Sequence, residues 1–438
     1  MFTTSRELEY FSEAELVTQT GYSKEEWWPR MLVKELIDNS LDACEQAGVA
    51  PDIGVCASDT ALTVSGNGPG IDREVITRIL DFSTRTSDKA AYVSPTRGAQ
   101  GNALKTVLAI PYVLNEGRPA RVEIESRGLR HTIVVSTDDI GRRPQIDHSA
   151  AIVVKTEGTS IRVVRDSASS QEEPGDAQFL QNLILDYSLF NPHATLRLHQ
   201  DGQGNRFAAS GDGFRKWLPS DPTSVHWYNR ERFENLVASC IAAERTGSRQ
   251  RTVREFISDF RGLSGTAKQK QVIAQAGLDR AYLHDLVLSS GQLDRRALQR
   301  LLDVAQRASA PVKPEALGVL GEDHFRERMS HSPSGNSFRY KRLHGFSENL
   351  PFVVECAFAV TDDPVLLGRH IGLNWSVPLS NPIQENQFDL ADGSTAWGLP
   401  ALLARNRIDL DSDPVCLVLH LICPRFHFLD RGKGRVDL

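Results

Sequence analysis

The feature that most constrains the fold is a glycine-rich segment, "TVSGNGPGID", between two stretches of different periodicity. An apolar, β-branched run ending at Val64 favours a β-strand, and the apolar spacing after Asp72 predicts a helix. Between them, glycine stands at positions 66, 68 and 70. Glycine lacks a Cβ and tolerates positive φ, so such a loop lets the backbone approach a ligand closely. Taken alone, the segment is better explained as a tight turn.

The surrounding residues predict an alternation of helices and short strands. In residues 24–48, apolar side chains recur on one face, which predicts one long helix that ends at Gly48. Polar residues dominate 83–101, a segment long enough to be a lid or a binding segment. The patterns also predict strands at 52–57 and 61–66, helices at 72–82 and 102–114, strands at 121–128, 130–138 and 151–164, a helix at 179–190 and a strand at 194–200.

The pattern changes after about residue 225, which predicts an α+β chain of three domains. Short helical patterns separated by glycines fill 226–306, and a proline-containing linker follows at 309–318. Strand patterns return from about residue 350. We expect domains at 1–225, 226–307 and 308–438.

Composition excludes several classes of protein. The chain has 438 residues and a net charge of −6, and no apolar run approaches the length of a membrane span. Its polar N-terminus does not resemble a signal peptide. The six cysteines form no CxxC pair, which argues against zinc and predicts a reducing cytoplasm. Residues 241–306 contain 11 Lys and Arg against 7 Asp and Glu, which suits DNA contact and an ordinary solvated surface equally.

The segment "KELIDN" contains residues suited to nucleotide chemistry. Glu35 and Asn39 are four residues apart, so both project from one face of the predicted helix. A carboxylate there could polarise a water, and the amide oxygen could bind a hard cation such as Mg²⁺. Taken alone, the pair is better explained as a solvated helix face.

A third motif, "RGAQGNALKT", places Gly98 and Gly101 before a predicted helix. A helix N-terminus attracts anions, and Arg97 and Lys105 add positive charge. Read alone, the motif fits an N-capped helix as well as a phosphate site.

The order of these motifs resembles the GHKL ATPase superfamily, and most closely the B subunit of type IIB DNA topoisomerases, topoisomerase VI. The similar segments are "KELIDNSLDACEQAG", "GNGPGI" and "SPTRGAQGNALKTV", with "LEYFSEAELVTQTG" similar to the strap that crosses to the dimer partner. The resemblance implies an N-terminal Bergerat sandwich, a mixed sheet with helices on one face. It also implies a helix–two-turns–helix domain and a ribosomal S5-like transducer domain.

The resemblance implies roles for individual residues. Glu35 would be the general base for the attacking water, and Asn39 would bind Mg²⁺. Thr159 in "EGTSI" would support the adenine end, and Lys433 in "FLDRGKG" would contact the γ-phosphate. Further nucleotide-binding residues would be Asn67, Gly68, Gly70, Arg97, Gly98, Ala99, Gln100, Gly101, Asn102 and Lys105.

The chain departs from the family pattern at Gly66. The family has an aspartate there, which accepts a hydrogen bond from the adenine amino group. Such a charge-assisted bond contributes roughly 1.5–3 kcal/mol, so its loss would weaken ATP binding about tenfold to a hundredfold. Only five residues, "GRVDL", follow Lys433, where the family continues into a stalk helix.

The sequence therefore leaves two hypotheses about function, from different classes of protein. The first is an ATP-gated dimeric clamp that uses ATP and Mg²⁺ and acts on DNA with a separate partner subunit. The alternative is a nucleotide-sensing or scaffold module with little turnover, which Gly66 and the short end of the chain suggest. A MutL-like repair ATPase fits the first domain but fits the helical segment poorly.

Overall fold

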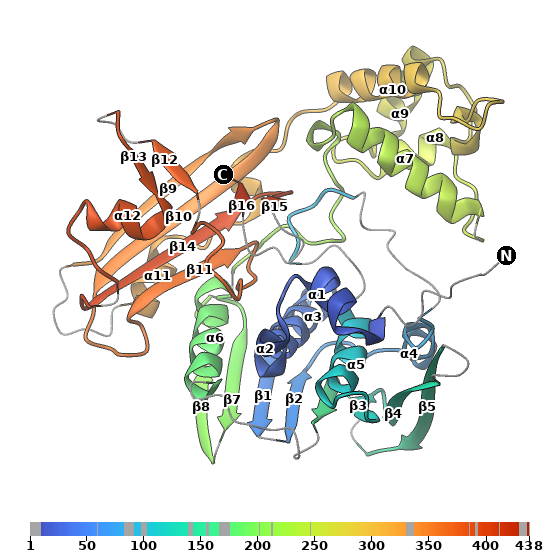
Figure 1. Cartoon of the computed structure of the whole chain (residues 1–438). Helices are drawn as coiled ribbons and strands as arrows, with labels where there is room; N and C mark the ends of the chain where they lie inside the picture. Colours follow the sequence, from blue (N-terminus) through green and yellow to red (C-terminus); the bar gives the residue numbers. More distant parts are fainter. Residues whose placement is uncertain are drawn as a thin grey trace.

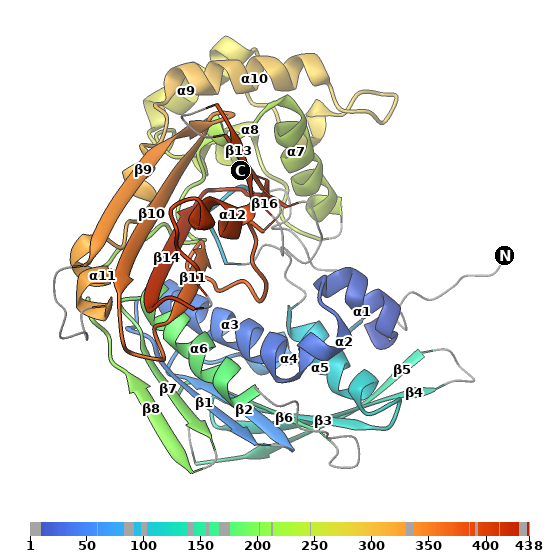
Figure 2. The same ribbon diagram turned by 60° about the vertical axis from the view of Figure 1, so that its left-hand side comes forward.

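A computed structural model describes most of the chain. The described residues are 10–58, 60–82, 92–97, 103–138, 143–154, 157–165, 176–200, 202–211, 213–245, 247–329, 337–384, 386–389, 393–410, 412–428 and 436–437. In this part of the chain, three bodies can be followed in Figures 1 and 2. They are an N-terminal sheet with its helices (the first body), a group of helices (the helical segment), and a second sheet with its helices (the second α/β body).

The N-terminal sheet has eight strands in the order β5-β4-β3-β6-β2-β1-β7-β8. β1 and β7 pair in parallel, and the other neighbouring strands pair antiparallel. The strands are β1 (Asp52–Ser58), β2 (Ala61–Gly66), β3 (Ala120–Ser126), β4 (Leu129–Asp138), β5 (Arg143–Ile152), β6 (Thr159–Val164), β7 (Thr195–Gln200) and β8 (Gln203–Phe207).

Helices cover one face of this sheet (Figure 2). They are α1 (Glu13–Thr20), α3 (Leu32–Gln46), α5 (Ala103–Leu114) and α6 (Asp176–Phe190), with the short α2 (Lys24–Glu26) and α4 (Arg73–Ile79). The alternation of β1 and β2 buries Ile53, Val55, Leu62 and Val64 beneath α3. The predicted α+β class, with a mixed sheet and helices on one face, is confirmed.

Two details of the sequence prediction were wrong. The helix expected over 24–48 is interrupted by a π-helical turn at Trp27–Met31, where Trp28 takes extended angles (φ −110°, ψ 131°). Trp28 precedes Pro29, and the proline ring disfavours helical angles in the residue before it. The strand pattern at 151–164 belongs to two strands, because β5 ends at Ile152 and β6 begins at Thr159.

The helical segment contains α7 (Arg230–Arg245), α8 (Val253–Ser258), α9 (Thr266–Ala276) and α10 (Arg295–Ala308). Its aromatic core packs Phe233, Phe256 and Phe260 against one another. Three 3₁₀ turns accompany these helices, at Val225–Trp227, Leu283–Leu286 and Pro314–Leu317. The domain boundaries at 225 and 307 stay predictions.

A second sheet follows, with the strand order β11-β14-β10-β9. Its strands are β9 (Arg339–Ser347), β10 (Leu350–Val360), β11 (Gly368–Leu373) and β14 (Val415–Ile422). It is accompanied by α11 (Glu322–Met329), α12 (Gly398–Ala404) and two short hairpins, β12 (Gln387–Asp389) with β13 (Thr395–Trp397), and β15 (His427–Phe428) with β16 (Val436–Asp437).

The second sheet contacts the first body through β11 and α6. A Cβ built on Gly372 of β11 would lie 2.6 Å from Cγ of Phe190, the last residue of α6. Phe190 is fully buried and stacks on His420 of β14. This contact therefore has no room for a side chain at position 372.

We predict that Gly372→Ala destabilises the protein by about 1–3 kcal/mol, because the added methyl group overpacks a closed contact. Thermal and denaturant unfolding would measure the change. Gly213→Ala is the matched control, since a Cβ at Gly213 meets no atom within 4 Å. Equal unfolding midpoints for Gly372→Ala and Gly213→Ala would contradict the prediction.

Candidate functional site

Helix α3 presents Glu35 and Asn39 one turn apart on its surface. The Glu35 side chain is 24% exposed, so its carboxylate is accessible to water. Asn39 Nδ2 is buried and has no hydrogen-bond partner among the described residues. This N–H donor could be satisfied by an acceptor of a ligand, and the amide oxygen of the same side chain is the type of atom that Mg²⁺ prefers.

The glycine loop after β2 packs directly on the same helix. A Cβ at Gly66 would lie 3.2 Å from Cβ of Ser40, and one at Gly68 would lie 3.4 Å from Sγ of Cys44. Gly70 has φ +83°, and a Cβ there would approach Ser126 Oγ to 2.9 Å. The glycines therefore allow the loop to lie against α3 close to Asn39.

β6 completes this arrangement. Thr159 pairs with Gly66 across the ladder between β2 and β6, and its hydroxyl lies 3.4 Å from Ser126 Oγ. Gly158 has φ +75°, and a Cβ there would overlap the carbonyl oxygen of Gly66 at 2.2 Å. The structure thus brings the glycine loop against α3 and pairs it with Thr159, while Glu35 and Asn39 lie on that same helix. The sequence analysis missed Gly158 and Ser126, which hold the loop from the strand side.

The side chain of Asn67 has a different use from the predicted one. Its Oδ1 accepts from the Asp52 backbone N–H (2.8 Å) and from Cys44 Sγ (3.3 Å), and its Nδ2 donates to the Ala50 carbonyl (2.9 Å). These bonds occupy the amide and fasten the loop to the connection between α3 and β1. A nucleotide contact at this residue would come from its backbone.

Arg97, which was predicted to bind phosphate, has its charge paired within the protein. Its guanidinium is buried and donates to Asp42 (2.5 Å), Glu45 (2.6 Å) and Asn191 (2.5 Å). Its Nε donates to the Trp375 carbonyl in the second α/β body (3.3 Å). Asp42 and Glu45 on the buried side of α3 therefore neutralise the charge of Arg97.

Lys105 on α5 is also engaged within the protein. Its ammonium donates to the Asp81 carbonyl at 2.7 Å and lies 5.9 Å from the centre of the Phe82 ring. The remaining predicted site residues lie outside the described part of the chain; they are Gly98, Ala99, Gln100, Gly101, Asn102 and Lys433.

The charges around Arg97 shift the pKa values of their neighbours. Burial opposes the ionisation of Glu45, yet Arg97 and Lys216 hold its pKa well below the usual range. Lys216 lies 2.7 Å from Glu45, but burial and the nearby Arg97 lower its pKa to about 8. Its ammonium also lies 4.6 Å from the centre of the Trp375 ring.

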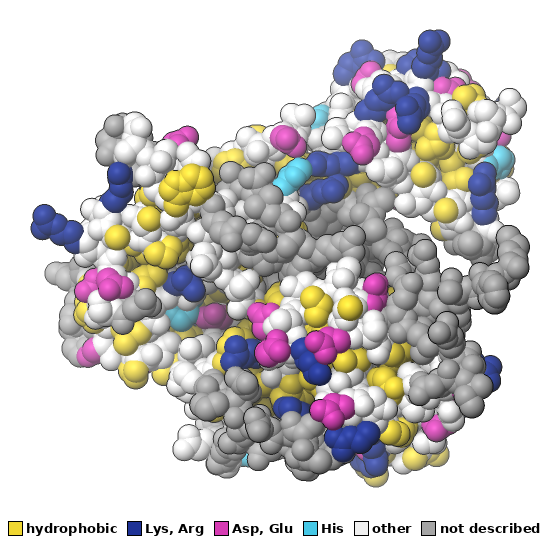
Figure 3. Space-filling view, viewed as in Figure 1, with side chains coloured by type: hydrophobic (Ala, Val, Ile, Leu, Met, Phe, Trp, Pro, Cys, Tyr) yellow, Lys and Arg dark blue, Asp and Glu magenta, His cyan; other side chains and the backbone are white. Residues whose placement is uncertain are grey.

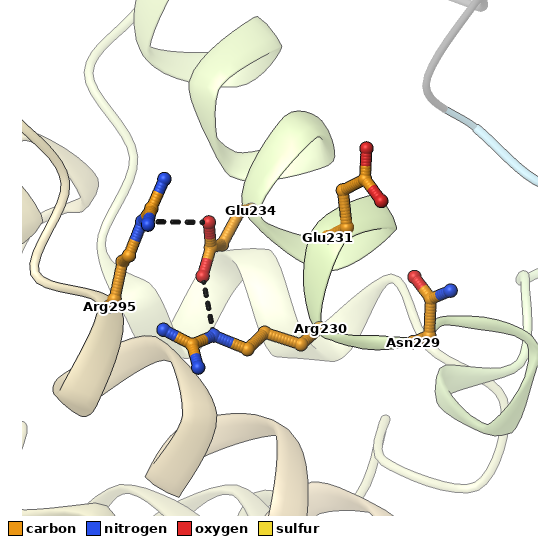
Figure 4. A pocket seen from close by; sticks show the side chains of 5 residues that line it. All are labelled: Asn229, Arg230, Glu231, Glu234 and Arg295. Atoms are coloured by element: carbon orange, nitrogen blue, oxygen red, sulfur yellow. Dashed lines mark hydrogen bonds and ion pairs between the residues drawn. The ribbon is translucent and has the colours of Figure 1, made fainter.

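A surface pocket between α7 and α10 is separate from this site. Figure 4 shows Glu234 between two arginines, and its carboxylate lies 2.9 Å from Arg230 and 3.3 Å from Arg295. These ion pairs neutralise the central carboxylate, and the pocket contains none of the predicted site residues.

We predict that Glu45→Gln destabilises the protein by about 3–5 kcal/mol at pH 7, because it leaves Arg97 without its main counter-charge. The pKa of Glu45 is lowered in the folded state, so its contribution is complete above the unfolded value of 4.5 and is lost as the pH falls below it. Denaturant unfolding would be measured at pH 7 and below pH 4.5. The free energies of unfolding of the parent and of Glu45→Gln should converge as the pH falls. A difference in unfolding free energy that stays constant with pH would contradict this prediction. Glu74→Gln, at an exposed position, is the control.

Among the described residues, no helix is both long and apolar enough to cross a membrane. No family model matches the chain. Among solved structures, the MutL ATPase domain of Aquifex aeolicus complexed with ADP matches with a TM-score of 0.27 and 18% identity, over 47% of this chain and 66% of that one.

Curated proteins give a longer alignment. The chain is 24% identical over 436 residues to the B subunit of type 2 DNA topoisomerase 6 from Archaeoglobus fulgidus, covering 95% of this chain and 68% of that protein. It is 30% identical over 178 residues to the corresponding protein of Natronomonas pharaonis, covering 38% of this chain but 21% of that protein. Part of each relative is therefore unmatched. The predicted resemblance is confirmed: along nearly its whole length, this chain is similar to the B subunit of type 2 DNA topoisomerase 6.

Proposed function

We propose that this chain is an ATP-hydrolysing, ATP-gated dimeric clamp that acts on DNA together with a separate partner subunit. The observation that carries the proposal is the position of Glu35 and Asn39 on α3, beside a glycine loop packed on the same helix. The similarity to the B subunit of topoisomerase 6 supports it. Mg²⁺ would bind Asn39 and neutralise phosphate charge.

In this proposal, each part of the site has a limited task. Glu35 accepts a proton from the attacking water, and its partial exposure lets that water reach it. The loop of Gly66, Gly68 and Gly70 lets the backbone lie along the nucleotide. Lys433 would contact the γ-phosphate. Phosphoryl transfer depends mainly on such positioning and on charge neutralisation.

In this proposal, the helical segment is the surface that would contact DNA. Lys and Arg side chains gather on the helical segment (Figure 3). Several of them already have partners, since Arg249 pairs with Glu255, Arg251 pairs with Asp259, and Lys268 donates to the Gly262 carbonyl. These contacts reduce the free positive charge that the composition of 241–306 indicates.

The alternative, a nucleotide-sensing or scaffold module, is supported by two observations. Gly66 lacks the carboxylate that would bind the adenine, and Arg97 is neutralised inside the protein. Such a module would bind a partner protein without nucleotide and would show little turnover.

We predict that Glu35→Ala lowers the ATP turnover number by about 10²–10⁴-fold while ATP binding persists, because only the base is removed. It should also trap an ATP-dependent dimer, measured by light scattering after gel filtration. The exposed Glu74→Ala is the matched control. A Glu35→Ala protein that stays monomeric at saturating ATP would contradict the clamp, and parent turnover independent of Glu35 would contradict the assigned base.

We predict that Gly66→Asp tightens ATP binding about tenfold to a hundredfold, through one added charge-assisted hydrogen bond. Gly66→Ala is the matched control, because it adds the same Cβ against Ser40, 3.2 Å away, without the carboxylate. Titration calorimetry with ATP and GTP would measure both variants. Equal affinities for the two variants would show that position 66 does not recognise the base.

A further inference from the structure

A buried lysine joins Glu35 to a second carboxylate of α3. Lys34 Nζ lies 3.3 Å from Glu35 Oε1 and 3.0 Å from Asp38 Oδ2. The side chains of Lys34 and Asp38 are 10% and 9% exposed. Burial alone would lower the pKa of Lys34, but the two carboxylates raise it well above the usual value, so the lysine stays charged.

Asp38 is held from the other side by two hydroxyl groups. Ser376 Oγ donates to Asp38 Oδ2 at 2.6 Å, and Tyr187 of α6 donates to Asp38 Oδ1 at 2.8 Å. Ser376 and Tyr187 are both buried. Lys34 and Ser376 therefore share one oxygen of this carboxylate, and the position of each depends on the other.

Ser376 lies in an unusual turn after β11. Asn374 (φ +48°) and Trp375 (φ +66°) both have left-handed angles, which are unfavourable for residues other than glycine. The Asn374 amide exchanges two hydrogen bonds with the Cys423 backbone, at 2.9 and 3.0 Å. The turn is thus fastened both to α3 and to the segment just after β14.

We propose that Ser376 is a positioning residue for the Glu35 carboxylate, acting through Asp38 and Lys34. This inference rests on the proposed ATP hydrolysis. Without the Ser376 hydroxyl, Lys34 is the one remaining donor to Asp38 Oδ2 among the described residues. The Asp38 carboxylate then attracts Lys34 Nζ more strongly and draws it away from Glu35. Hydrolysis then requires the turn at 373–376 to be docked on α3. The second α/β body thereby controls the base through a contact far from Lys433 in sequence.

The test compares Ser376→Ala with Ser188→Ala in the full chain. Ser188 is a buried serine on α6 whose hydroxyl donates to Leu185 of its own helix at 2.7 Å, so the control loses a similar bond away from Asp38. We expect Ser376→Ala to lower kcat about tenfold, with the KM and Kd for ATP unchanged. Ser188→Ala should keep kcat within about twofold of the parent.

A double-mutant cycle with Asp38→Asn separates positioning from general damage. If Ser376 acts through Asp38, Ser376→Ala should change kcat less than about twofold in the Asp38→Asn background. Equal kcat losses for Ser376→Ala in both backgrounds, a loss matched by Ser188→Ala, or a change in KM alone would overturn the inference.

The outcome also distinguishes this inference from the proposed function. Turnover abolished by Glu35→Ala but unaffected by Ser376→Ala would leave the ATPase standing and remove the role of Ser376. A parent protein without Glu35-dependent turnover would overturn both.

Discussion

The buried ion pairs of Arg97 with Asp42 and Glu45 are the contact on which the rest of the structure depends. They join the segment 92–97 to α3. The same guanidinium also donates to Asn191, just after α6, and to the Trp375 carbonyl. Charges withdrawn from water are stable only when every partner is in place. The orientation of α3, and with it the face that bears Glu35 and Asn39, is therefore set from the buried side.

Helix α3 performs three tasks on three of its faces. Leu36 and Leu41 belong to the apolar face buried in the core of the first body. Asp38 contacts Ser376 of the second body. Glu35, with a partly exposed side chain, and Asn39 belong to the face assigned to the candidate site. Because one rigid element carries all three, a shift of the second body has a direct mechanical route to the candidate site.

Local sequence patterns were sufficient for the main elements, because the apolar periodicity of α3, β1 and β2 is regular. The roles of the candidate site residues came from the family resemblance and stay predictions. The strand β5 was only partly seen, because most of its residues are exposed and no apolar alternation marks it. The interruption at Trp28 is encoded in the dipeptide with Pro29, but the surrounding helical pattern obscured it.

The roles of Arg97 and Asn67 could not be obtained in the same way. Both were assigned by motif position, whereas their real partners are set by tertiary contacts. The Arg97 guanidinium meets the carbonyl of Trp375, 278 residues later in the chain, and no local signal identifies such a partner. Similarly, nothing in "KELIDN" announces that Asp38 needs the hydroxyl of Ser376.

The distance in sequence between Arg97 and Trp375 has a consequence for synthesis on the ribosome. The segment 373–376 emerges last among the partners of α3, after the whole helical segment. Until then, Asn191 Nδ2 and Arg97 Nε lack their common acceptor, the Trp375 carbonyl, and the space that Trp375 fills is open. The N-terminal sheet can fold first, because domains fold as units during synthesis, but the buried surface that Trp375 covers stays exposed until the later residues are made. A nascent chain of this protein would need protection from association until its second sheet is made.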